Sequence, residues 1–75
     1  MVVEFVRRVV AGYGPEGEPV ELSFSPGDIL IFGGESRRPG WIVAVDGSGI
    51  PYDVPREAVK ITEDLPLPSQ RRGAA

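Results

Sequence analysis

Apolar and polar residues alternate with a period of two along much of this chain, as they do in β-strands that bury one face. Within residues 21–31, Leu22 and Phe24 alternate with polar neighbours. A Pro-Gly-Asp turn follows, and an apolar run resumes at Ile29. No long segment repeats its apolar residues with the helical period, and valine is the dominant apolar residue. The pattern therefore predicts an all-β fold.

Glycine and proline punctuate the chain at short intervals and separate five expected strands. The segment 46–49, Asp-Gly-Ser-Gly, predicts a tight hairpin turn because its glycines tolerate positive φ. Pro55 permits one helical turn before the last strand. The expected strands are residues 2–11, 29–32, 41–45, 50–54 and 59–62.

The chain has 75 residues, which is enough for one domain with a small core. We expect residues 1–62 to form this domain and residues 63–75 to form a flexible tail, because the tail contains a Leu-Pro-Leu-Pro segment at residues 65–68 and ends in small and basic residues. Residues placed on alternating faces of the expected strands should form the core, namely Val9, Leu22, Phe24, Leu30, Ala44, Val54 and Val59.

The composition argues against catalysis and metal binding. There is no cysteine and no histidine, so disulfides, thiolate zinc sites and the commonest general base are absent. The sequence also shows no paired-carboxylate motif and no phosphate-binding glycine loop. We therefore expect a protein that is not an enzyme and that has no metal site and no cofactor.

Charge and hydropathy limit the expected classes of partner and the expected cellular location. The net charge is −3, which argues against a basic nucleic-acid-binding surface. No signal peptide or membrane-spanning run is visible, so the expected location is cytoplasmic. Seven of the eight basic residues are arginine and there are eight prolines, which fits a thermophilic source and a GC-rich genome equally well.

The order of these elements resembles the architecture of a Src-homology-3 domain across residues 5–62. The alternating Leu-x-Phe followed by a Pro-Gly-Asp turn is similar to the family's diverging turn. Trp41, directly after Gly40, resembles the family's ligand-binding tryptophan, and Pro55 opens a segment similar to its aliphatic-Pro-x-x-Tyr-Val motif. The resemblance implies a small five-stranded Src-homology-3-like barrel with one short 3-10 turn before the last strand.

The resemblance also implies a function, a protein–protein interaction module that binds a Pro-rich peptide or a protein surface in an aromatic groove. Ala11 and Ala58 stand where the family has tyrosines, so isolated Pro-rich peptides should bind only above about 100 μM. Carboxylates of the loop before residue 19 would pair with a basic ligand residue, as they do in the family. The expected ligand-binding residues are Tyr13, Glu16, Glu18, Trp41, Tyr52 and Pro55.

Other interpretations remain open for these residues. The positions of Trp41 and Tyr52 are also typical of residues that pack in a core. Tyr13 is also typical of a residue that packs under a loop, and the glutamates are typical of solvated surface residues. The Arg37-Arg38 loop would instead contact phosphate if the protein bound nucleic acid or a nucleic-acid machine, and a structural or inhibitory role would not use the groove. The tail resembles a Pro-rich ligand that would bind its own barrel or a neighbour's. We expect a monomer with a protein or peptide partner and without nucleic-acid or membrane contacts.

Overall fold

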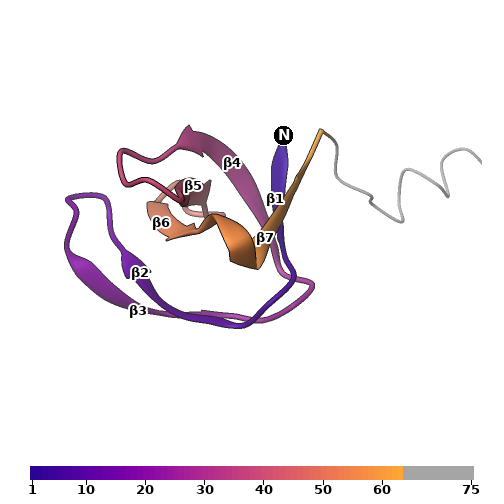
Figure 1. Ribbon diagram of the computed structural model, residues 1–75, viewed down its shortest axis with the longest axis horizontal. Coiled ribbons are helices and arrows are strands. Elements are labelled where there is room, and N and C mark those ends of the chain that lie inside the picture. The colour runs from indigo at the N-terminus through magenta and orange to yellow at the C-terminus, as the bar shows by residue number, and fades with distance from the viewer. Residues whose placement is uncertain (64–75) are drawn as a thin grey trace, which may run out of the picture.

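In a computed structural model, which describes residues 1–63, the chain forms seven antiparallel strands in one sheet. The strand order is β3-β2-β6-β5-β4-β1-β7, so β3 and β7 are the two edges of the sheet (Figure 1). One turn of 3-10 helix, η1 (Arg56–Ala58), precedes the last strand, as expected. The strands are β1 (Val2–Phe5), β2 (Val9–Tyr13), β3 (Pro19–Phe24), β4 (Ile29–Glu35), β5 (Trp41–Val45), β6 (Pro51–Pro55) and β7 (Val59–Thr62).

The all-β class is confirmed, but the expected count of five strands is wrong. Residues 2–11 divide into β1 and β2, because the backbone N–H groups of Val6 and Arg7 both donate to the carbonyl of Ala58, at 2.9 and 3.3 Å. This bend moves the chain from pairing with β4 and β7 to pairing with β3 and β6. In addition, residues 19–24 form a full strand, β3. Strand pairing does not close the expected barrel and leaves the sheet open, since the edge strands β3 and β7 do not pair with each other.

Strand β4 continues to Glu35, three residues beyond its expected end, through two glycines. Its register with β5 shifts between Phe32 and Glu35. A Cβ at Gly33 would lie 2.9 Å from Cγ1 of Val43, and Gly34 has a φ of +107°. Glycine avoids the close approach at position 33 and adopts the positive φ at position 34 without strain, so this pair lets β4 bend over β5.

The core lies on the inner face of the sheet and matches the sequence prediction. Val9, Ala44, Val54 and Val59 are buried. Leu22, Phe24 and Leu30 are half-buried and pack against the buried cluster. The Phe24 ring stacks on Phe5 with a centroid distance of 4.6 Å. The other buried apolar residues are Val2, Val3, Phe5, Ile42 and Ala58.

The hairpin of β5 and β6 separates an inner from an outer face. The turn forms as expected: Asp46 accepts hydrogen bonds through Oδ1 from the N–H groups of Ser48 and Ile50, at 2.8 and 3.0 Å. The register then sets Trp41 opposite Pro55 and Val43 opposite Asp53. Because Ile42, Ala44 and Val54 between them are buried, these pairs lie on the outer face.

Two loops flank this outer face on the same side of the sheet, the β2–β3 loop (residues 14–18) and the β4–β5 loop (residues 36–40) (Figure 1). Within the described part of the chain, no helix has the length and hydropathy that a membrane span requires. The predicted tail, apart from Glu63, lies outside the described residues.

Candidate functional site

Three of the predicted site residues meet on the outer face, at the ends of three different strands. Trp41 begins β5 and lies directly opposite Pro55 at the end of β6. The ring of Tyr13, at the end of β2, meets Trp41 edge-on, with centroids 5.3 Å apart and ring planes at 67°. All three side chains are half-buried. We call Tyr13, Trp41 and Pro55 the aromatic surface.

Local backbone contacts hold Trp41 in place. Gly40 has a φ of +83°, which allows a turn in which the Trp41 N–H donates to the Arg38 carbonyl at 3.1 Å. The Gly40 carbonyl in turn accepts a hydrogen bond from the N–H of Arg56 at 2.9 Å. The β4–β5 loop is thus tied to η1, and Trp41 leaves it at a fixed position on the sheet.

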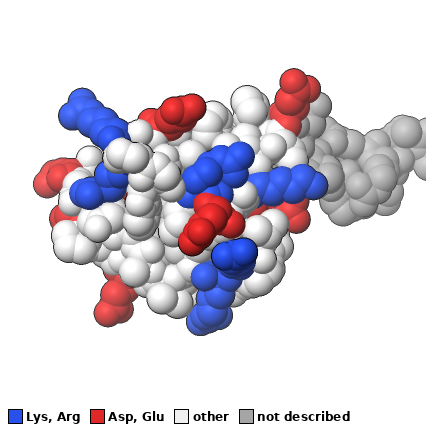
Figure 2. Space-filling view, viewed as in Figure 1, with Lys and Arg blue, Asp and Glu red and all other residues white. Residues whose placement is uncertain are grey.

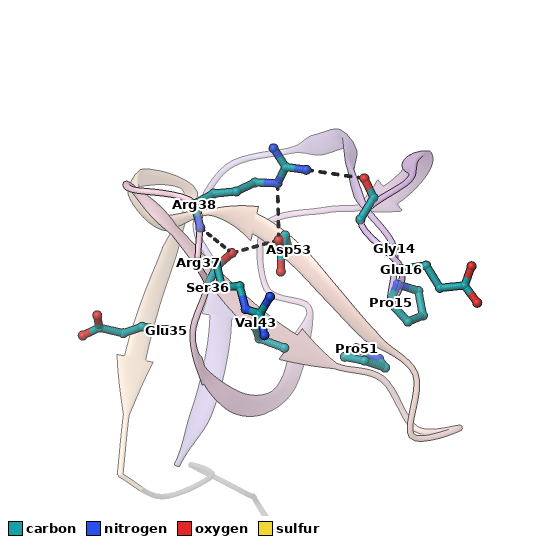
Figure 3. Close-up of a pocket in the computed structure, with 11 residues that line it drawn as sticks. Gly14, Pro15, Glu16, Glu35, Ser36, Arg37, Arg38, Val43, Pro51 and Asp53 are labelled. Atoms are coloured by element: carbon teal, nitrogen blue, oxygen red, sulfur yellow. Dashed lines mark hydrogen bonds and ion pairs between the residues drawn. The ribbon is translucent and has the colours of Figure 1, made fainter.

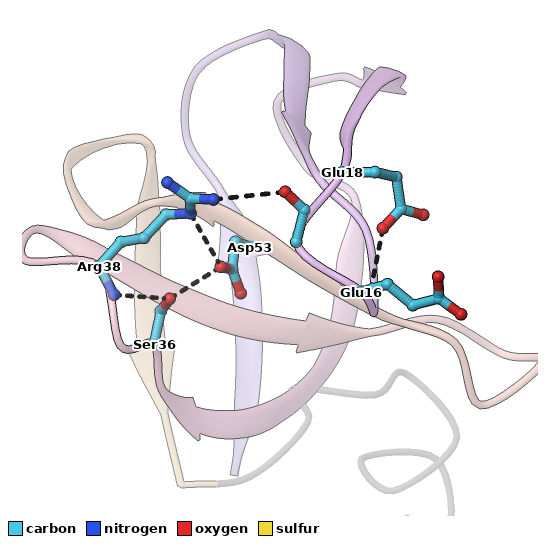
Figure 4. A network of polar contacts seen from close by, with 6 residues as sticks. Glu16, Glu18, Ser36, Arg38 and Asp53 are labelled. Carbon is cyan, nitrogen blue, oxygen red and sulfur yellow. Dashed lines mark hydrogen bonds and ion pairs between the residues drawn. The ribbon is translucent and has the colours of Figure 1, made fainter.

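Glu16 and Glu18 are exposed in the β2–β3 loop, as expected for its rim. The two carboxylates differ in their surroundings. Glu18 Oε1 accepts a hydrogen bond from the N–H of Glu16 at 2.9 Å, and a Cβ at Gly14 would clash with the Glu18 carboxylate. Glu18 therefore stabilises its own loop, whereas the Glu16 side chain projects away from it (Figure 4).

Tyr52 is separated from the other predicted site residues. It lies opposite Ala44 in the β5–β6 pairing, and its ring packs near Phe24 with a centroid distance of 6.4 Å. Tyr52 therefore belongs to the margin of the core on the inner face. Of the two alanines in tyrosine-like positions, Ala58 is buried and Ala11 is exposed on β2.

Sequence reasoning did not find a polar network beside the aromatic surface. The Ser36 hydroxyl donates to Asp53 Oδ2 at 2.8 Å, and Arg38 Nε lies 3.6 Å from the same oxygen. The N–H of Arg38 donates to the Ser36 hydroxyl at 3.1 Å (Figure 4). Asp53 in β6 pairs directly with Tyr13 in β2, which brings the network to the tyrosine ring.

Arg38 joins the two loops across this network. Its guanidinium carbon lies 3.5 Å from the centroid of the Tyr13 ring, in cation–π geometry. Its Nη2 group donates to the Gly17 carbonyl of the β2–β3 loop at 3.4 Å. The sequence of residues 36–38 predicts a solvated polar loop. No local signal reveals the contacts of Arg38, because they depend on the pairing of β2 with β6.

Between the two loops is an open hollow of about 630 Å³. Figure 3 shows Arg38 and Asp53 pointing toward one another in its wall, while Glu35 and Glu16 project outward on opposite sides. The remaining lining combines Arg37 and Ser36 with glycine backbone and with apolar side chains, including Val43 and Pro51. The site therefore has an aromatic part and an adjoining charged part.

The described residues contain no group of three or more acidic side chains arranged to hold a metal ion. On the face seen in Figure 2, Lys and Arg side chains lie beside Asp and Glu side chains and form no continuous basic area. No protein-family model, curated protein or solved structure matches the chain.

Proposed function

We propose that this chain is a non-enzymatic protein–protein interaction module, similar to a Src-homology-3 domain, that binds a peptide or protein surface through a groove around Trp41. The observation that carries the proposal is the position of Trp41. It is half-buried on the outer face, in edge contact with Tyr13 and opposite Pro55, while the core on the inner face is filled by other residues.

The aromatic surface has the features of an interface anchor. Tryptophan and tyrosine dominate binding energies at interfaces because they bury large areas and have few rotatable bonds. Here the two rings already contact each other, and backbone hydrogen bonds hold the start of β5. Such pre-ordered side chains lose little conformational entropy when a partner binds.

The partner in this proposal is a protein surface or a Pro-rich peptide, bound by a monomeric, cytoplasmic protein. The interspersed charges in Figure 2 favour this class over nucleic acid, which requires a concentrated basic surface. Arg38 is already engaged with Asp53 and Tyr13, which reduces what the β4–β5 loop can offer to phosphate.

The test is an affinity capture from the native host with the wild-type chain, Trp41→Ala and Ile50→Ala. Ile50 is an apolar residue, 39% exposed, at the β5–β6 turn, so its replacement is the matched control. We expect Ile50→Ala to retain the partner and Trp41→Ala to lose it, with a weakening of more than about 1 kcal/mol in a subsequent titration. Equal retention by both folded variants would refute the proposed surface.

A further inference from the structure

The side chain of Arg38 occupies a site that is built to hold a cation. Three groups surround its guanidinium: the face of the Tyr13 ring, the Asp53 carboxylate and the Gly17 carbonyl. An aromatic face, a carboxylate and a carbonyl oxygen all attract positive charge. They come from β2, β6 and the β2–β3 loop, whereas Arg38 enters from the β4–β5 loop.

The contacts of Arg38 leave part of this site unused. Nε of Arg38 is 3.6 Å from Asp53 Oδ2, and its Nη2 is 3.4 Å from the Gly17 carbonyl, so both contacts are long for hydrogen bonds. Both the Ser36 hydroxyl and Arg38 Nε contact the same oxygen of the Asp53 carboxylate, Oδ2. A guanidinium that arrived from outside would use both oxygens in a bidentate pair. The Arg38 side chain is also 40% exposed, so it is held at the surface and not locked into the core.

The charge of the hollow depends on Arg38. Its lining carries three carboxylates and two guanidinium groups, so its formal charge is −1 with Arg38 present and −2 without it. Removal of Arg38 would therefore expose both an aromatic face and a more negative wall to solvent. The charged lining residues are Glu16, Glu35, Asp53, Arg37 and Arg38.

We propose that Arg38 is a specificity-determining residue of the aromatic surface: it fills the cation site from within the chain and thereby excludes basic side chains of partners from Tyr13. The proposal rests on the proposed function, since it states what the partner presents at this end of the surface. A tethered side chain acts at an effective concentration in the millimolar range or above, so a free cation has to compete with Arg38 before it binds. Partners that meet Tyr13 through an uncharged segment avoid this competition.

The test needs no natural partner, because guanidinium chloride and N-acetylarginine amide serve as probes. The Tyr13 ring protons and the Trp41 indole N–H are followed by NMR, with sodium chloride at matched ionic strength as the reference. Probe concentrations reach about 50 mM, well below those that unfold small domains. We expect saturable shifts in Arg38→Ala, and binding at least about tenfold weaker in the wild-type chain.

Three variants control the interpretation. Arg38→Met retains an unbranched aliphatic side chain and removes only the charged group over the ring, so it replaces Arg38→Ala if that variant is unfolded. Adding Asp53→Asn to either variant should abolish the gained binding, because the carboxylate is removed. Arg37→Ala changes the formal charge of the hollow by the same amount but leaves Arg38 in the cation site, so it should behave like the wild-type chain.

The proposal is overturned if the folded Arg38 variants respond to the probes no more than the wild-type chain does. It is also overturned if the gained shifts persist in the Asp53→Asn double variants. These outcomes are independent of the affinity capture. A failed capture test with Trp41→Ala removes the proposed function but leaves the cation site measurable, and a failed titration leaves the aromatic surface intact.

Discussion

Replacing Phe24 with alanine is expected to destabilise the domain severely. Phe24 joins the edge strand β3 to two distant parts of the sheet, through its stacked contact with Phe5 in β1 and its edge contact with Tyr52 in β6. Phe-to-Ala replacements in cores cost about 3–5 kcal/mol, and the ring-pair contact itself contributes about 0.5–1.5 kcal/mol. Since Phe24 is half-buried, we expect a loss of about 2–4 kcal/mol.

That loss is large for so small a domain. At about 0.05–0.15 kcal/mol per residue, the 63 described residues correspond to about 3–9 kcal/mol of total stability. Urea unfolding followed by Trp41 fluorescence and circular dichroism measures the difference. The control is Val10→Ala, a β2 residue that is 56% exposed, for which the expected change is within about 0.5 kcal/mol. A Phe24→Ala loss below about 1 kcal/mol, or one equal to the Val10→Ala loss, would refute this account of the core.

The other predictions concern the backbone, the site and the partner class. Gly12→Ala should cost about 1–3 kcal/mol in thermal unfolding, because its Cβ would clash with the Asp53 carbonyl and lie 2.6 Å from Leu22 Cδ1; an unchanged melting temperature contradicts this packing. Acrylamide should quench the fluorescence of Trp41, and Trp41→Ala should fold. If the indole is shielded from the quencher and its replacement unfolds the chain, Trp41 is a core residue. Oligonucleotides should not bind at physiological salt; micromolar, salt-sensitive binding that Arg37→Ala with Arg38→Ala abolishes would favour the nucleic-acid alternative.

Local patterns in the sequence were sufficient for much of the core and part of the site. The alternation at Leu22 and Phe24 predicted which side chains pack inward, since successive residues in a strand point to opposite faces. The turn at residues 46–49 fixes the register of its hairpin, and that register sets Trp41 opposite Pro55. Both features depend on neighbours within about fifteen residues, where turn chemistry and the period of a strand decide the geometry.

The features that the sequence alone does not reveal depend on segments that are far apart in the sequence. Valine continues on both sides of the bend at Val6, so the alternation gave no sign that β1 and β2 are separate strands, and the bend is fixed by hydrogen bonds to Ala58. For Tyr52 the sequence leaves both the groove and core packing open, and its place opposite Ala44 turns its ring inward. In each case a contact made across the fold decided what a local pattern left open.

The cation site beside the aromatic surface shows the same division most clearly. The sequence determined that Arg38 lies in a polar loop and that Asp53 lies in a strand. Only the pairing of β2 with β6, which joins Tyr13 to Asp53 across forty residues of sequence, creates the site that Arg38 fills. Such a pairing depends on how the whole core packs, because no turn connects the two strands. It places the charge of Arg38, which the sequence alone predicts to be solvated, against an aromatic ring.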